Sequence, residues 1–305
     1  MDLRHLRYFM AVAEAGHITR AAEVLGIQQP PLSQQIRALE AELGAPLFTR
    51  HPKGVDLTDT GRQLKVEAAR LLADVAGMQQ RMSAFVRGER GRIALGFTSS
   101  AAAHAFTPDA LRTCRRKHPD IHMEVSEHNA AEITDAVANA RLHCGFLRVP
   151  VARPAGLAFE ELLQEESLLA IPVDHRLARD KSKPVELKEL RGERLILVRR
   201  PGAPGLYANL LAACARHAIE VELAAEVERM STNINLVAAG VGLSLVPASV
   251  RGAHTHAVVY RPLADPGKLT APLTLVYRKA DCDGPTGTFI ALARRVAAAY
   301  RTPRD

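Results

Sequence analysis

Residues 19–43 constrain the fold of this 305-residue chain more than any other stretch. A short helix is predicted first, with one apolar face made by Ala21, Ala22 and Leu25. Gly26 can end it, because glycine readily adopts the left-handed conformation of a helix exit. A second helix is predicted to begin at the prolines, and Pro31 suits its first position, where a missing N–H costs nothing. Its apolar side chains recur at helical spacing and predict one buried stripe: Leu32, Ile36, Leu39 and Leu43.

The opposite face of the second helix is polar and is predicted to point outward. It carries Gln29, Ser33, Gln34 and Arg37. Two short helices joined by a glycine turn are typical of the helix-turn-helix, whose second helix fits the DNA major groove. Glutamine can bond adenine through two groups, arginine can reach phosphate or guanine, and proline offers an apolar edge to a thymine methyl. An ordinary helical hairpin with a solvated polar face is the alternative interpretation.

A basic hairpin is predicted to follow these helices. Residues 50–57 contain Pro52 and Gly54 in a turn between two short strands, which indicates a wing. Arg50 and Lys53 at its tip are suited to phosphate or minor-groove contact, and a basic surface turn is the alternative. A helix over residues 3–15 is predicted to serve as scaffold. The candidate DNA-contacting residues are Arg20, Gln29, Pro30, Pro31, Ser33, Gln34, Arg37, Arg50 and Lys53.

A long helix is predicted from Thr58, a residue type suited to an N-cap, to about Val86. Its apolar positions are separated by 4, 3, 4, 3, 4 and 3 residues: Leu64, Ala68, Leu71, Val75, Met78, Met82 and Phe85. So narrow a heptad seam is better explained by a partner helix than by burial on the chain's own core. Residues 58–86 are therefore predicted to form a homodimer. Two glycines and four charges within residues 87–92 then break the pattern and indicate a hinge.

From residue 93 short apolar segments alternate with helical ones, which predicts an α/β fold with parallel strands and right-handed crossovers. The predicted strands are 93–97, 122–126 and 142–146, then 168–171, 195–198, 221–224 and 243–246, then 273–277 before a helix over 288–300. The predicted domains are a winged helix-turn-helix (1–58), a linker helix (59–87), a hinge (88–92), and two α/β subdomains, subdomain I (93–160 and 267–305) and subdomain II (161–266).

Residues 1–65 resemble the N-terminal domain of the LysR-type transcriptional regulators. The segments that carry the resemblance, in order, are Met-Asp-Leu-Arg-His-Leu-Arg-Tyr-Phe, Gln-Gln-Pro-Pro-Leu-Ser-Gln-Gln-Ile-Arg-Ala-Leu-Glu, Leu-Gly-Ala-Pro-Leu-Phe-Thr-Arg and Leu-Thr-Asp-Thr-Gly. Residues 161–175 and 236–249 are similar to regulatory-domain motifs of that family. The resemblance implies a bacterial regulator with a winged helix-turn-helix, a dimerising linker helix, a ligand-sensing α/β domain, a homotetrameric assembly and contact with RNA polymerase. Many members carry a basic residue where this chain has Gln34, so base preference there departs from the family's pattern.

Two α/β halves with two crossing connections resemble the periplasmic binding proteins, in which ligand sits at the strand ends. A helix N-terminus offers free N–H groups and a positive dipole end, so Ser99 and Ser231 are predicted to face each other and hold a carboxylate. The alternative is that such residues only cap helices. The predicted lining is Thr98, Ser99, Ser100, His128, Asn129, Phe146, Arg148, Arg199, Pro201, Gly202, Ser231, Thr232 and Asn233, with Phe146 and Pro201 covering a carbon skeleton.

The net charge of +7 lies mainly outside the predicted DNA-binding domain. Residues 1–90 contain 12 Lys and Arg against 10 Asp and Glu, which leaves +5 for residues 91–305. DNA affinity is therefore expected from a few placed cations and from dimeric binding to a dyad-symmetric operator. The excess in the larger part favours a small organic anion, such as an aromatic or unsaturated carboxylate. Neither a membrane-spanning run nor a signal peptide is indicated, so a cytoplasmic location is expected.

Two other functions remain open. A redox sensor of the same family would need two cysteines that approach each other, but Cys114, Cys144, Cys214 and Cys282 are scattered without a CxxC pair, which also argues against zinc. An α/β hydrolase would have to use Ser99, His128 and an acidic residue, without a GxSxG elbow. The prediction is therefore a DNA-binding regulator and not an enzyme, with a small-molecule effector and no metal or cofactor.

Overall fold

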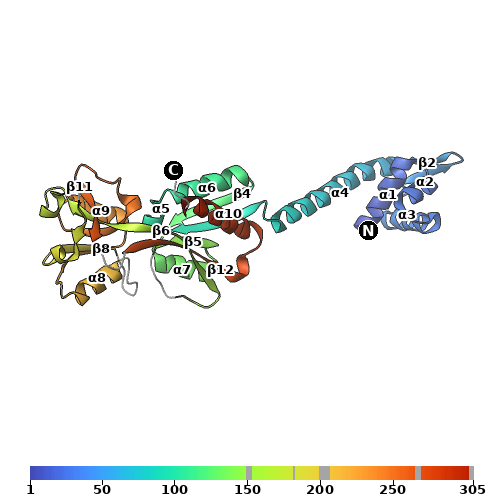
Figure 1. Ribbon diagram of the computed structural model, residues 1–305. Helices are drawn as coiled ribbons and strands as arrows, with labels where there is room; N and C mark the ends of the chain where they lie inside the picture. The colour runs from blue at the N-terminus through green and yellow to red at the C-terminus, as the bar shows by residue number, and fades with distance from the viewer. Residues whose placement is uncertain (149–152, 181–182, 199–206, 265–268, 302–305) are drawn as a thin grey trace. The chain divides into compact units, whose positions relative to one another are not determined.

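The computed structural model describes residues 1–148, 153–180, 183–198, 207–264 and 269–301 (Figure 1). The chain divides into two compact units, Met1–Ser83 and Ala84–Asp305, with the boundary inside helix α4 (Asp59–Val86). Each unit has its own hydrophobic core. Over the described ranges, no helix combines the length and apolar character needed to cross a membrane.

The N-terminal unit is built on a helix-turn-helix. Its elements are α1 (Leu3–Ala15), α2 (Ile18–Leu25), α3 (Gln29–Leu43), β1 (Phe48–His51) and β2 (Gly54–Leu57). Gly26 ends α2 in the left-handed conformation with φ 66°, as predicted. The prediction that Pro31 takes the first helical position is wrong, since α3 starts two residues earlier, at Gln29. Both prolines still lie in the first turn, where no backbone N–H is needed.

The predicted stripe of α3 forms the centre of this unit's core. Leu32, Ile36 and Leu39 are almost fully buried, whereas Leu43 at the end of the helix is 40% exposed. The three buried leucine and isoleucine side chains pack with residues of α1 and with Val55 of the hairpin. His51 pairs with Gly54, so Pro52 and Lys53 form a two-residue turn and the predicted wing exists. The Val55 amide donates to the Gly16 carbonyl at 2.9 Å, which attaches the hairpin to the end of α1.

Helix α4 contributes to the N-terminal core and then leaves it. The Thr58 hydroxyl accepts from the Gly61 amide at 2.9 Å, so this residue does cap the helix. Leu64 and Ala68 pack into the core of the N-terminal unit. The prediction that the whole seam meets a partner helix is therefore wrong for its first two positions. Further along, large apolar side chains remain exposed: Leu71 (46%), Met78 (51%), Met82 (56%) and Phe85 (48%).

The C-terminal unit is organised around one mixed sheet. Its strands are β3 (Gly91–Phe97), β4 (Ile121–Glu127), β5 (Cys144–Leu147), β6 (Leu157–Pro172), β7 (Val185–Glu186), β10 (Ser244–Pro247), β11 (Val258–Ala264) and β12 (Thr270–Arg278). Their order is β4-β3-β5-β12-β6-β11-β7, and β10 also pairs with β6. β3 pairs parallel with β4 and β5, but β12 runs antiparallel to β5 and β6. The predicted parallel sheet is confirmed for β3, β4 and β5 but is wrong for β12, which the returning chain inserts antiparallel between β5 and β6.

Strand β6 connects the two halves of this unit. Its segment 157–166 pairs with β12, whereas 167–172 pairs with β10 and β11. Only 168–171 was predicted as strand, because the preceding stretch carries several glutamates that weaken the strand signal. The predicted boundary between subdomains I and II at residues 160 and 161 thus falls within a continuous strand.

Helices cover both faces of each half (Figure 1). In subdomain I, α6 (Phe106–Lys117) and α10 (Gly284–Arg301) pack on one face and α7 (Ala130–Ala138) on the other. In subdomain II, β8 (Arg194–Val198) and β9 (Glu222–Val227) pair in parallel between α8 (Tyr207–Arg216) and α9 (Met230–Ala238). Short helices complete the unit: α5 (Ser99–Ala102), η1 (Arg176–Ala178), η2 (Leu187–Leu190), η3 (Ala248–Val250) and η4 (Lys279–Asp281). The α/β class predicted for this part of the chain is confirmed.

The exposed seam of α4 generates the first prediction. Met78→Glu would place a carboxylate between paired helices, which is unfavourable without a partner, so we expect dimerisation to weaken by about a hundredfold or more. Gln79→Glu, at the exposed neighbouring position off the seam, serves as the control and is expected to leave the dimer intact. Light scattering after size-exclusion chromatography measures the mass of each full-length variant. The wild-type mass for both variants would exclude this seam as the interface.

Candidate nucleic-acid interface and ligand site

Helix α3 presents a polar surface formed by Gln29, Gln34 and Arg37, all of them exposed. Ser33 is not part of it, and its predicted outward orientation is wrong, because its side chain turns toward the core and is only 9% exposed. Its hydroxyl accepts a hydrogen bond from Nε2 of Gln29 at 3.0 Å. Ser33 therefore orients Gln29 and does not itself face a ligand.

Exposed cations surround this polar surface in the N-terminal unit. They are Arg20 on α2, Arg37 on α3, and Arg50 and Lys53 on the hairpin. In the described part of the chain none of the four forms an ion pair with an acid, so all are free to meet phosphates. The exposed rings of Pro30 and Pro31 lie in the same first turn of α3. This arrangement combines amide and guanidinium groups of the types that read base edges with cations of the type that binds phosphates.

In the C-terminal unit, the N-termini of two helices from different subdomains meet. The Ser99 hydroxyl, at the start of α5, accepts a hydrogen bond from the backbone amide of Met230, at the start of α9, at 3.0 Å. Ser231 and Thr232 follow in the exposed first turn of α9. Thr98 caps α5 by accepting from the Ala101 amide at 3.3 Å. The structure therefore brings Ser99 to the helix that carries Ser231.

Several predicted lining residues have structural roles instead. Phe146 is fully buried in the core of subdomain I and stacks on Phe97 with ring centroids 4.8 Å apart, so its predicted place over a carbon skeleton is wrong. Asn233 is also fully buried, and its Nδ2 donates to the Tyr207 hydroxyl at 3.4 Å, so it cannot line an open cleft. Burial raises the pKa of that tyrosine to about 12. The Asn129 side chain accepts from the Glu132 amide at 2.9 Å and caps α7.

The remaining predicted residues divide into three groups. Ser100 is buried with its hydroxyl 3.5 Å from that of Thr98. His128 is exposed, and its Nε2 lies 3.0 Å from the Ser126 hydroxyl. Arg199, Pro201 and Gly202 lie outside the described residues.

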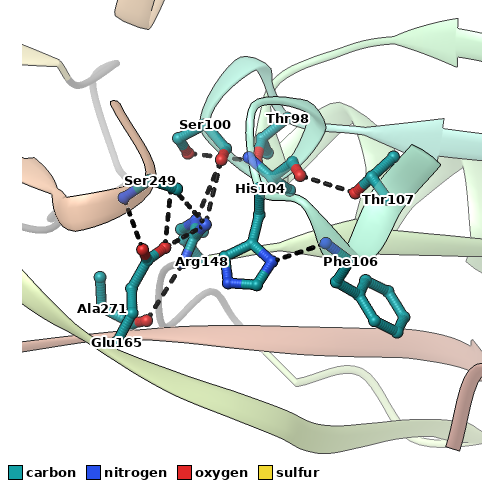
Figure 2. A network of polar contacts seen from close by, with 10 residues as sticks. Thr98, Ser100, His104, Phe106, Thr107, Arg148, Glu165, Ser249 and Ala271 are labelled. Atoms are coloured by element: carbon teal, nitrogen blue, oxygen red, sulfur yellow. Dashed lines mark hydrogen bonds and ion pairs between the residues drawn. The ribbon is translucent and has the colours of Figure 1, made fainter. Parts of the chain in front are cut away.

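Arg148 lies at the centre of a buried polar network between the subdomains (Figure 2). It is 2% exposed, so its prediction as a lining residue is wrong. Nε and Nη2 donate to the Ser100 carbonyl at 3.2 and 3.1 Å, and Nη1 donates to the Ala271 carbonyl at 3.2 Å. Burial lowers the pKa of this guanidinium, and the ion pair with Glu165 opposes that effect.

Glu165 extends the network into subdomain II. Its carboxylate accepts from the Ser249 amide at 2.7 Å and from the Ser249 hydroxyl at 3.0 Å. The ion pair thus joins α5 of subdomain I to η3 of subdomain II. Beside the pair lies His104, whose pKa is lowered mainly by burial (Figure 2). Glu165 and Ser249 were not predicted from the sequence, because nothing in a Gln-Glu-Glu-Ser run distinguishes the buried carboxylate from the exposed one.

The geometry gives no support to the two other functions. Cys114, Cys144 and Cys214 are buried and burial raises the pKa of all three thiols, which leaves Cys282 as the exposed thiol. For a hydrolase, His128 would have to bond the Ser99 hydroxyl. That imidazole contacts Ser126 instead, and Ser99 accepts from α9.

A winged helix-turn-helix joined to a two-lobed α/β unit, with helix N-termini meeting between the lobes, defines the class of ligand-responsive DNA-binding regulators. Residues 3–62 match the bacterial regulatory helix-turn-helix proteins of the lysR family, and residues 87–298 match the LysR substrate binding domain. The chain therefore belongs to the LysR family of transcriptional regulators. This is a family of regulators and not of enzymes, and the predicted winged helix-turn-helix with its α/β regulatory domain is confirmed.

Relatives match along nearly the whole chain. The HTH-type transcriptional regulator BudR of Raoultella terrigena is 34% identical over 92% of this chain and 95% of its own length. The regulator BenM of Acinetobacter baylyi is 34% identical over 92% of this chain and 91% of its own length. Among solved structures, full-length CbnR complexed with its target DNA is similar with a TM-score of 0.75 at 28% identity, covering 97% of this chain and 100% of that one.

Gln34 and Lys53 are expected to contribute differently to DNA binding. If Gln34 makes a paired base contact, Gln34→Ala should relax base preference at one position per half-site and cost about 1–3 kcal/mol. Lys53→Ala should weaken binding to all DNA sequences alike, since phosphate contacts carry no sequence information. Selection of binding sites from a randomised DNA pool measures both effects. An unchanged consensus for Gln34→Ala would rule out the base contact.

The buried ion pair leads to a prediction about stability. Glu165→Gln keeps the shape of the side chain but leaves the Arg148 charge buried without its counter-charge, so we expect the C-terminal unit to lose about 3–5 kcal/mol of unfolding free energy. Glu160→Gln removes the partner of Arg294 in an exposed pair on the same strand and should cost at most about 1 kcal/mol. Urea unfolding of the two full-length variants makes the comparison. Equal losses would show that Glu165 does not stabilise the fold through Arg148.

Proposed function

We propose that a small organic anion controls the operator binding or the transcription activation of this regulator, and that it binds where α5 and α9 meet. The observation that carries the proposal is the hydrogen bond of 3.0 Å from the Met230 amide to the Ser99 hydroxyl. It brings a serine of one subdomain to the N-terminus of a helix of the other. A ligand held there contacts both subdomains, so its binding free energy depends on their relative position.

The first turn of α9 has the chemistry that a carboxylate requires. The Asn233 amide is the first to bond within the helix, to the Arg229 carbonyl at 3.1 Å. The amides of Ser231 and Thr232 therefore precede the helical ladder, and the helix dipole adds a positive potential. Ser99, Ser231 and the +5 net charge of residues 91–305 also favour an anion. Phe146 and Pro201 were the two residues expected to cover an aromatic or unsaturated carbon skeleton, and Phe146 is instead buried in the core. The proposal is therefore kept to the wider class of small carboxylates.

The remaining parts of the proposal concern assembly and partners. Exposed apolar side chains along α4 support a homodimer through residues 58–86, and pairs of dimers would give a homotetramer. Two such DNA-binding units suit a dyad-symmetric operator, with RNA polymerase as the further partner. The cytoplasm is the compartment in which a bacterial regulator meets operator DNA. No cofactor is part of this mechanism.

Ser99→Ala tests the effector site. A hydrogen bond to a charged group contributes about 1.5–3 kcal/mol, so binding of the carboxylate should weaken about tenfold or more. A thermal-shift screen of organic acids selects the ligand, because a ligand of the folded state raises the melting temperature, and calorimetry then gives its affinity. Operator binding serves as the control and should be unchanged. Unaltered affinity in both Ser99→Ala and Ser231→Ala, or a cationic preferred ligand, would contradict the site.

A further inference from the structure

We propose that the ion pair of Glu127 and Arg229 is a displaceable clasp between the two subdomains, and that Arg229 binds the effector's carboxylate once Glu127 has released it. The inference rests on the proposed function, since it assumes an anionic effector at the N-terminus of α9. It adds a specific recognition residue, and it identifies the group of the chain that occupies this residue before the effector does.

The clasp joins the two subdomains beside the proposed site. Glu127 is the last residue of β4 in subdomain I, and Arg229 is the residue that precedes α9 in subdomain II. Nη1 of Arg229 lies 2.8 Å from Oε1 of Glu127. The adjacent residue, Met230, donates its amide to Ser99. Two neighbouring residues of subdomain II thus bind oxygen atoms of two separate side chains of subdomain I, Glu127 and Ser99. The oxygens of the effector's carboxylate would take the place of these oxygens.

The position of Arg229 favours an anion for a second reason. A cation at the N-terminus of a helix is repelled by the positive end of the helix dipole. Arg229 occupies that position on a nine-residue helix, and its own side chain makes no capping hydrogen bond. One anion placed there relieves the repulsion and satisfies both the guanidinium and the free amides. In this structure the Glu127 carboxylate provides that negative charge.

Exposure decides which contacts between the subdomains can be exchanged. The Glu127 and Arg229 side chains are 42% and 62% exposed, so their pair changes an equilibrium constant by no more than about fivefold. The Arg148 and Glu165 side chains are 1% and 11% exposed, and separating them would leave a buried charge without a partner. The buried pair therefore stays in place while an incoming carboxylate displaces the exposed one.

Calorimetric titration of the full-length protein with acetate, fumarate and benzoate tests the clasp. Glu127→Gln removes the competing charge, so the affinity for whichever of these three carboxylates binds best should rise two- to fivefold. The control is Glu124→Gln, which removes a carboxylate from the same strand, where it pairs with Arg92 inside subdomain I. It should leave the affinity unchanged. Arg229→Gln should weaken binding by about tenfold.

The double variant separates competition from simple repulsion. If Glu127 acts by occupying Arg229, Glu127→Gln should have no effect in the Arg229→Gln background, whereas repulsion of the ligand by Glu127 would persist there. The same tightening in both backgrounds, equal tightening by Glu124→Gln, or no change in Glu127→Gln would overturn the inference while leaving the anionic effector intact. If none of the three carboxylates binds the wild type or Glu127→Gln, the inference and the proposed site both fail.

Discussion

The regulatory unit depends on a charge that cannot leave the interior. The Arg148 guanidinium is buried, and its pairing with Glu165 fixes three segments at once: α5 through the Ser100 carbonyl, strand β12 through Ala271, and η3 through Ser249. Removing water from a cation is costly unless an anion and several oxygens replace it, and here the backbone supplies most of those oxygens. The relative position of the two subdomains near this network is thus set by electrostatics, while the exposed Glu127–Arg229 pair joins them more weakly.

The DNA-binding unit is built on the opposite principle. Its interior is mainly apolar, and the exposed cations that could meet DNA lie on α2, α3 and the hairpin. Because residues 1–90 carry a net charge of only +2, general attraction to the polyanion is small. In the proposed mode of DNA binding, discrimination would rely on the exposed amides of Gln29 and Gln34 and on binding two half-sites together. Ser33 shows how the core contributes to this surface, since a nearly buried hydroxyl orients the Gln29 side chain.

The sequence predicted what depends on neighbours along the chain. The helix over 3–15, the exit at Gly26 and the long helix to Val86 all follow from local periodicity and capping, and each agrees with the structure. Predictions that depend on distant partners were wrong or incomplete. Phe146 lies near the end of strand β5, where a lining residue would be expected, but aromatic rings from other segments enclose it. From the sequence alone Arg148 is indistinguishable from a surface cation, because its partner Glu165 is distant along the chain. The full length of β6 could not be predicted either, because it depends on pairing with β12 and β10.

The order of the strands has a consequence for how the chain folds as it is synthesised. β12 lies between β5 and β6 in the sheet, yet of the described strands it is the last to leave the ribosome. Until then β5 and β6 have an unpaired edge each, and the core around Leu273 and Leu275 lacks its centre. Pairing across so long a separation in sequence is slow, because loop-closure entropy must be overcome first. The nascent regulatory domain therefore exposes open sheet edges, on which strands of other chains can add, until translation is nearly complete.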